Sequence, residues 1–190
     1  MSLWQSVKNT AQAAANLVKS LFSSQAPSPN AACLSSASNI VYGGTPAEQK
    51  QLKDMVEKMR DGGPKGKAFI ESLEKGPKPT RLQIAKSATK KDGAVIPLSN
   101  TGGGVTLRPT ESKSGDNEVY VDPTNLINYK ATDGTMVKET PEGLLLHEMG
   151  HAGRLNAGDP AQTSGGAAAE ANVRTDTNPI RQEMGMKPEK

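Results

Sequence analysis

The sequence is poor in the residues that build disulfide frameworks and large cores. Cys33 is its only cysteine, so an intrachain disulfide is excluded. Aromatic residues make up 3% of the 190 residues and hydrophobic residues 34%, which is low for a compact domain. Together with 19 glycines and 13 prolines, this composition predicts a modest core flanked by long irregular stretches.

Long apolar runs, basic clusters and histidines are also scarce. No apolar stretch approaches the roughly 20 residues that span a bilayer, so we expect no transmembrane segment. The 23 basic and 20 acidic residues are interspersed, and no Lys/Arg run is combined with aromatic residues, so we expect no nucleic-acid partner. The only two histidines, His147 and His151, belong to one motif. Cys33 therefore has no free histidine to activate it, and we interpret it as an incidental thiol.

The first 38 residues differ in composition from the rest. Apolar residues recur at three- and four-residue steps over 1–22, which predicts an amphipathic helix. Such a helix can bind a membrane surface or a partner, pack on the domain, or form part of a leader. The Ser/Pro/Ala/Asn-rich stretch 23–38 cannot order itself, so we predict a flexible leader at 1–38 and a folded domain at 39–190. Because Lys19 interrupts the apolar part, a cleaved signal peptide is not expected.

The predicted domain contains both strand and helix signals. Short apolar or alternating runs predict strands at 39–42, 81–85, 94–98, 105–108 and 118–122. Capping residues and apolar spacing predict helices that begin at Pro46, near Phe69, at Pro141 and after Gly166. These elements predict an α+β fold, in which a short, mostly antiparallel sheet of three or four strands packs on the helix from Pro141 and on a C-terminal helix.

The helix from Pro141 contains the segment His147-Glu148-Met149-Gly150-His151. Two histidines four residues apart lie on one helical face, about 5–6 Å apart at their roots, so both rings can bind one Zn²⁺. Glu148 then lies beside the metal, where it can take a proton from a zinc-bound water and pass it to a leaving amine. The motif therefore predicts a zinc-dependent peptidase. The alternative is a helix with two surface histidines.

A catalytic zinc site needs a third protein ligand. Because the chain has no further histidine, we expect a carboxylate, or less favourably a tyrosine. Glu170 follows His151 after 18 intervening residues, on a separate predicted helix, an arrangement that resembles the gluzincin peptidases. Glu170 is therefore our first choice, and the alternatives are Asp159, Asp176 and Glu183.

Two further features of a peptidase site have candidates in the sequence. The tetrahedral intermediate carries an oxyanion, and the residues that could help to stabilise it are Tyr120, Tyr129, Arg174 and Arg181. The strand predicted at 118–122 lies just upstream of the motif. In zincin folds an edge strand in this place aligns the peptide substrate through main-chain hydrogen bonds.

Three segments in the last third of the chain follow a known pattern. They are Leu145 to Ala152, Glu170 to Arg174, and Ile180 to Pro188. This pattern resembles the NleD-like zinc metalloproteases, a family of type III secreted bacterial effectors with relatives among toxin domains. The resemblance implies a small zincin-like domain and an endopeptidase that is delivered to the host-cell cytoplasm and cleaves a signalling protein there, such as a kinase. It also implies that residues 1–38 act as an uncleaved secretion signal, read by the secretion machinery or a chaperone.

Gly150 departs from the family pattern, which tends to have a larger apolar residue at this position. We expect this glycine to permit close packing of the motif helix against the sheet. Two other functions remain open from the residues themselves. The same zinc site could hydrolyse a non-protein amide, or the protein could be a non-enzymatic effector that binds a host partner through residues 1–22.

Overall fold

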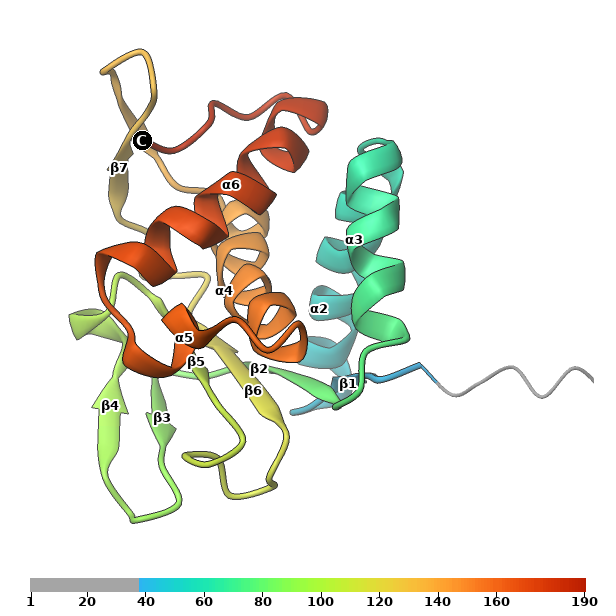
Figure 1. The fold of residues 1–190 in the computed structure, drawn as a ribbon, viewed down its shortest axis with the longest axis vertical. Helices are drawn as coiled ribbons and strands as arrows, with labels where there is room; N and C mark the ends of the chain where they lie inside the picture. The colour runs from blue at the N-terminus through green and yellow to red at the C-terminus, as the bar shows by residue number, and fades with distance from the viewer. Residues whose placement is uncertain (1–37) are drawn as a thin grey trace, which may run out of the picture. The chain divides into compact units, whose positions relative to one another are not determined.

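The structure, a computed structural model, describes residues 38–190 (Figure 1). The amphipathic helix predicted at 1–22, Cys33 and nearly all of the predicted leader lie outside the described residues. In chain order the elements are β1 (Ile40–Tyr42), α2 (Pro46–Asp61), α3 (Pro64–Glu74), β2 (Thr80–Ile84), β3 (Ser87–Thr89), β4 (Val95–Pro97), the 3-10 helix η1 (Leu98–Asn100), β5 (Gly104–Leu107), β6 (Asn117–Val121), β7 (Asn128–Lys130), β8 (Met136–Lys138), α4 (Pro141–Asn156), α5 (Pro160–Ser164) and α6 (Ala167–Glu183). This element set confirms the predicted α+β class.

The main sheet has four strands in the order β1-β2-β6-β5. β1 and β2 are parallel, β2 and β6 are parallel, and only β5 runs antiparallel to its neighbour β6. The predicted mostly antiparallel sheet is therefore wrong. The reason is the connection between β1 and β2, in which α2 and α3 carry the chain back to the end of the sheet where β1 began, so that β2 runs in the same direction.

Two small hairpins lie outside the main sheet. The strand predicted at 94–98 is β4, and it pairs with β3 rather than with the main sheet. Asp133 and Gly134 lie in the turn that joins β7 and β8, a second hairpin whose strands the sequence signals did not reveal. Each strand of these hairpins has only three residues, which is too short for an alternating pattern to stand out.

The helix ends follow the predicted capping chemistry. Thr45 and Glu48 form the complete capping box of α2, with each side chain bonded to the backbone N–H of the other residue. The Thr140 hydroxyl caps α4 by accepting a hydrogen bond from the N–H of Gly143 at 3.0 Å. α6 continues through Pro179 as one helix. None of the helices in residues 38–190 is long and apolar enough to cross a lipid bilayer.

The core lies between the sheet and the helices. α2 and α4 pack directly on the strands, while α3 and α6 pack against these two helices (Figure 1). The predicted apolar face of α2 is buried, and so are Leu144, Leu145 and Met149 of α4. α4 therefore contacts the sheet with one side and α6 with another, which brings the motif helix next to the C-terminal helix.

Gly150 faces α6 and not the sheet, which corrects the packing that we expected from the sequence. A Cβ atom at this position would lie 2.8 Å from Cγ1 of Val173 and 2.9 Å from Cγ2 of Thr177. Both of these side chains are β-branched and stiff, and both are buried on α6. The missing side chain of Gly150 therefore sets the close approach of α4 and α6, and with it the distance between the residues that these helices carry.

Replacing Gly150 with leucine, a larger apolar residue, is expected to lower the free energy of unfolding by about 1–3 kcal/mol through overpacking. Urea denaturation followed by circular dichroism measures this change. Gly153→Ala is the matched control on the same helix, because its Cβ would meet Phe69 at 3.3 Å, a contact that a small ring movement relieves. Equal stability of Gly150→Leu and the unmodified protein would show that α6 is not held this closely.

Candidate metal centre

α4 positions both histidines of the motif. Their rings lie one helical turn apart, with centroids separated by 5.1 Å and planes inclined by 71°. Both side chains are mostly buried, with 15% of His147 and 16% of His151 exposed. Burial of the helix through its leucines fixes the direction in which the rings point, because α4 cannot rotate without exposing them.

Glu170, in the first turn of α6, reaches the same point in space. Its Oε2 lies 3.2 Å from Nε2 of His147, and its Oε1 lies 3.4 Å from Nε2 of His151. One ligand atom from each of these residues lies within 4.8 Å of the other two. The structure therefore brings together the three residues that the sequence predicted as zinc ligands.

The alternative third ligands are used elsewhere. Asp176 forms a two-point ion pair with the guanidinium group of Arg154, at 2.5 and 2.6 Å. Asp159 caps α5 by accepting from the N–H of Ala161. Glu183 accepts hydrogen bonds from the N–H groups of Lys65 and Gly66 at the start of α3. None of these three carboxylates belongs to the histidine cluster within residues 38–190.

The second ring nitrogen of each histidine has its own partner. Nδ1 of His147 lies 3.3 Å from Oε2 of Glu189, and Nδ1 of His151 lies 2.8 Å from Oε1 of Gln162. A hydrogen-bond acceptor at Nδ1 holds the ring proton there, which leaves the Nε2 lone pair free for a metal ion. The sequence did not reveal these two partners, because no fixed spacing from the motif specifies them.

The donor set suits a small divalent metal ion. Two imidazole nitrogens and one carboxylate oxygen are the ligands of many catalytic zinc sites, which leave a fourth position open. The same set also binds other first-row transition metals, so the residues alone do not fix the identity of the metal.

The electrostatics of the cluster favour positive charge between the rings. Burial lowers the pKa of His147, but its hydrogen bonds to Glu170 and Glu189 outweigh this effect and raise the pKa to about 10. The pKa of His151 is raised in the same way, against burial, by Glu170 and the charge of Glu148. The two histidines in turn lower the pKa of Glu170 through their hydrogen bonds. The two buried rings and the Glu170 carboxylate therefore favour a positive charge between them.

Glu148 turns away from the two rings and towards β5. Its carboxylate Oε2 lies 2.7 Å from the hydroxyl of Thr106, and that hydroxyl also lies 2.8 Å from the backbone oxygen of Glu148. Gly104 makes room for the carboxylate, since a Cβ there would lie only 2.7 Å from Cγ and Oε1 of Glu148. Burial raises the pKa of Glu148, although the charges of both histidines act in the opposite direction.

A cavity of about 490 Å³ opens above these residues. Its lining combines the two histidines, Glu148 and Glu170 with the edge strand β5 and the segment Ser164 to Gly166. The edge strand beside the motif is therefore β5 and not the predicted 118–122, which is β6 and lies between β2 and β5.

The four residues proposed for oxyanion stabilisation do not line this cavity in the part of the chain that the structure describes. Tyr120 donates to Glu118, and Tyr129 donates to the backbone oxygen of Lys187. Arg181 is fully buried in an ion pair with Glu139. Arg174 lies closest to the cluster, but its Nη1 is held between Glu189 at 3.6 Å and Glu170 at 4.0 Å.

The structure thus supplies three side chains that could hold a metal ion, a buried carboxylate beside them and a cavity with an edge strand, and no residue for the oxyanion among the four predicted. Comparison of the chain with protein-family models, with curated proteins and with solved structures finds no match, so the resemblance to the NleD-like family stays a prediction from the motif residues.

Proposed function

We propose that this protein is a zinc-dependent endopeptidase, with His147, His151 and Glu170 as metal ligands and Glu148 as general base. One observation carries the proposal. Both Nε2 atoms face the Glu170 carboxylate, both Nδ1 atoms have separate acceptors, and Glu148 lies beside them in the same cavity. A pair of surface histidines would have no such partners on either ring nitrogen.

A bound zinc ion would supply a Lewis acid that polarises the carbonyl of the scissile bond and acidifies a water molecule. Glu148 and Thr106 would carry out the proton transfer. Glu148 takes the proton from the water and delivers it to the leaving nitrogen. The Thr106 hydroxyl fixes one oxygen of that carboxylate, so the other oxygen of Glu148 is free to carry the proton.

The shape of the cavity supports a peptide substrate. β5 pairs on one side with β6, and its other edge borders the cavity, so its backbone groups can pair with an extended peptide. The cavity lining also contains Ser164, Gly165 and Gly166, which leave room for a substrate because serine is small and glycine has no side chain. An antiparallel peptide on β5 would pass directly over the Glu148 carboxylate.

The resemblance in the motif segments extends the proposal to the biological setting. In this view the described part of the chain is a small zincin of the gluzincin type, and the protein is secreted without a cleaved signal peptide. It would reach the host-cell cytoplasm through secretion machinery or a chaperone that reads residues 1–38. Its substrate would be a host signalling protein, such as a kinase.

Zinc content tests the proposal directly. Elemental analysis at neutral pH is expected to find one zinc ion per chain in the purified protein and almost none in His147→Ala. The two protein ligands that remain in this variant are too few to hold the ion. Glu170→Ala is expected to lose most of the zinc as well, whereas Asp176→Asn keeps it, since Asp176 is occupied by Arg154. Protein that binds no zinc even after zinc is supplied would contradict the proposal and favour a binding effector.

A further inference from the structure

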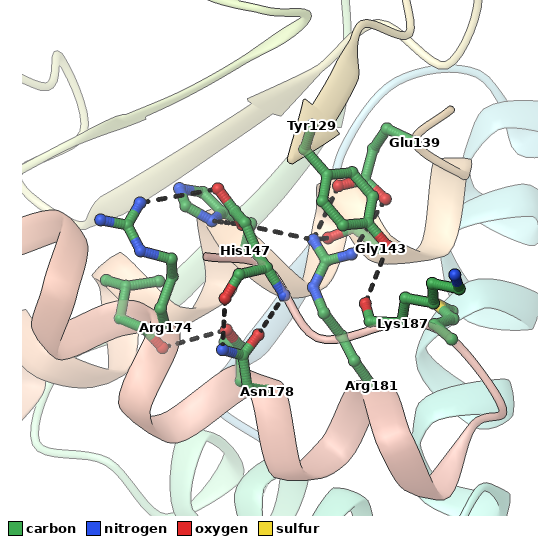
Figure 2. A network of polar contacts seen from close by, with 12 residues as sticks. Tyr129, Glu139, Gly143, His147, Arg174, Asn178, Arg181 and Lys187 are labelled. Atoms are coloured by element: carbon green, nitrogen blue, oxygen red, sulfur yellow. Dashed lines mark hydrogen bonds and ion pairs between the residues drawn. The ribbon is translucent and has the colours of Figure 1, made fainter. Parts of the chain in front are cut away.

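Glu189 lies in a segment that is tied down by its backbone. Asn178 on α6 clamps it, because the Asn178 amide donates to the backbone oxygen of Glu189 and accepts from its N–H, both at 2.7 Å. Glu189 also forms a bridge with Ala131, and the next residue donates to the backbone oxygen of Lys130 in β7 at 2.9 Å. Figure 2 shows Asn178 on the helix that also carries Arg174 and Arg181.

The side chain of Glu189 points from this clamp at one ring nitrogen. Its Oε2 lies 3.3 Å from Nδ1 of His147. Two arginines of α6 flank the same carboxylate, with Nη1 of Arg174 at 3.6 Å and Nη2 of Arg181 at 3.8 Å. Glu189 therefore places a mostly buried carboxylate, with only 18% of its side chain exposed, between Nδ1 of His147 and two guanidinium groups.

We propose that Glu189 is a positioning residue that keeps the proton of His147 on Nδ1 and its Nε2 lone pair aimed at the metal. The inference rests on the proposed zinc site and adds a residue to it that the motif does not contain. A carboxylate behind a metal-binding histidine orients the ring and strengthens it as a ligand. Asn178 acts one step further back, because it holds the backbone of Glu189 and does not touch His147.

The partner of His151 provides an internal comparison. Gln162 accepts from Nδ1 of His151 with a neutral amide oxygen. The two ligands on α4 therefore receive different support, one from a carboxylate and one from an amide. This difference predicts that an amide at position 189 retains part of the function of Glu189, because it still offers an acceptor to Nδ1.

Zinc affinity of the Glu189 variants tests the inference. In competition with a chromophoric chelator, Glu189→Ala is expected to bind zinc about 10–100-fold more weakly than the unmodified protein. Glu189→Gln is expected to lose less, since its amide oxygen can accept the Nδ1 proton. Glu183→Gln is the matched control, a carboxylate at the end of α6 that bonds to α3 and is expected to keep full affinity. Unchanged affinity in Glu189→Ala would overturn the inference.

A double-mutant cycle separates positioning from general stability. Asn178→Ala is expected to weaken zinc binding in the unmodified protein but to add little in the Glu189→Ala background. Asn178 acts only by holding the Glu189 carboxylate in place, and this carboxylate is already absent from Glu189→Ala. Additive losses would show that Asn178 acts independently of Glu189. They would overturn its place behind this carboxylate.

A readout without metal distinguishes failure of the inference from failure of the zinc site. The chain has only two histidines, so the ring signals of His147 and His151 can be assigned in ¹⁵N-resolved NMR spectra with one mutant. An Nδ1–H signal of His147 that is protected from exchange with water is expected in the metal-free protein, and this protection is expected to be lost in Glu189→Ala but kept in Glu189→Gln. If the protein binds no zinc, the proposed function fails, and this comparison still decides whether Glu189 holds the ring. Identical His147 signals in all three proteins would overturn the inference.

Discussion

Replacing Glu148 with glutamine is expected to lower kcat by about a hundred- to ten-thousand-fold while the protein keeps one zinc ion per chain. Glutamine has the shape of glutamate, and its amide oxygen can still accept the hydrogen bond from Thr106. It cannot take a proton from water, however, so the general base is lost while the three ligands stay in place. The measurement combines cleavage of an unstructured protein, followed by mass spectrometry, with zinc analysis of the same samples.

The matched control for this change is Glu142→Gln, which lies on the same helix. Glu142 pairs with Lys58 at the first turn of α4 and is far from the cavity, so its replacement is expected to leave cleavage and zinc content unchanged. Full cleavage by Glu148→Gln would contradict its role as general base. Zinc binding without cleavage of any protein by the unmodified chain would instead favour hydrolysis of a non-protein amide.

The part of the site that could be predicted from the sequence is the part set by one helix. His147, Glu148 and His151 have a fixed relation because helical geometry fixes it, whatever the rest of the chain does. Glu170 could be ranked first because it is an acidic residue at the start of a separate predicted helix. Glu189 could not be found in this way, since a hairpin and Asn178 bring it to the ring, and their positions depend on tertiary structure.

The difference between local and tertiary contacts also explains which predictions about the fold were correct and which were wrong. Capping residues predicted the start of α2 and α4, because a cap is a contact between residues two or three apart. The direction of the strands depends on which way the chain returns after α2 and α3, and no local pattern records this. The guanidinium group of Arg181 could stabilise an oxyanion, but the amino-acid sequence does not show that Arg181 is buried in an ion pair with Glu139.

That buried pair leads to the largest expected effect on stability. Arg181 is fully buried and Glu139 is 8% exposed, and the guanidinium group donates to both carboxylate oxygens, at 3.1 and 2.7 Å, and to the backbone oxygen of Gly143 at 3.0 Å (Figure 2). The ring of Tyr129 covers the guanidinium group, 4.9 Å from its centroid. Gly143 has no space for a side chain, since a Cβ would lie 2.2 Å from Oε1 of Glu139. The pair thus joins the segment before α4 to α6.

Glu139→Ala is expected to lower the free energy of unfolding by about 3–5 kcal/mol, because it leaves the buried guanidinium group of Arg181 without its hydrogen-bonded carboxylate, and only Glu189, at 3.8 Å, remains as a counter-charge. Urea denaturation followed by circular dichroism measures the loss. Glu142→Ala instead breaks an ion pair with Lys58, whose side chain is 65% exposed, and is expected to cost at most about 1 kcal/mol.

Removing the charges of both Glu139 and Arg181 distinguishes two causes of the stability loss: the burial of an unpaired guanidinium group, and the lost attraction between the two side chains. If the cost of Glu139→Ala comes from stranding Arg181 in the core, then Glu139→Leu combined with Arg181→Met is expected to be more stable than Glu139→Ala, although it also lacks the contacts of Arg181 with Gly143, Tyr129 and Glu189. The double variant would still leave the backbone oxygen of Gly143 without its donor, so full recovery is not expected. A double variant that is less stable than Glu139→Ala would show instead that the attraction between the two charges, and not the desolvation of Arg181, dominates at this junction of α4 and α6.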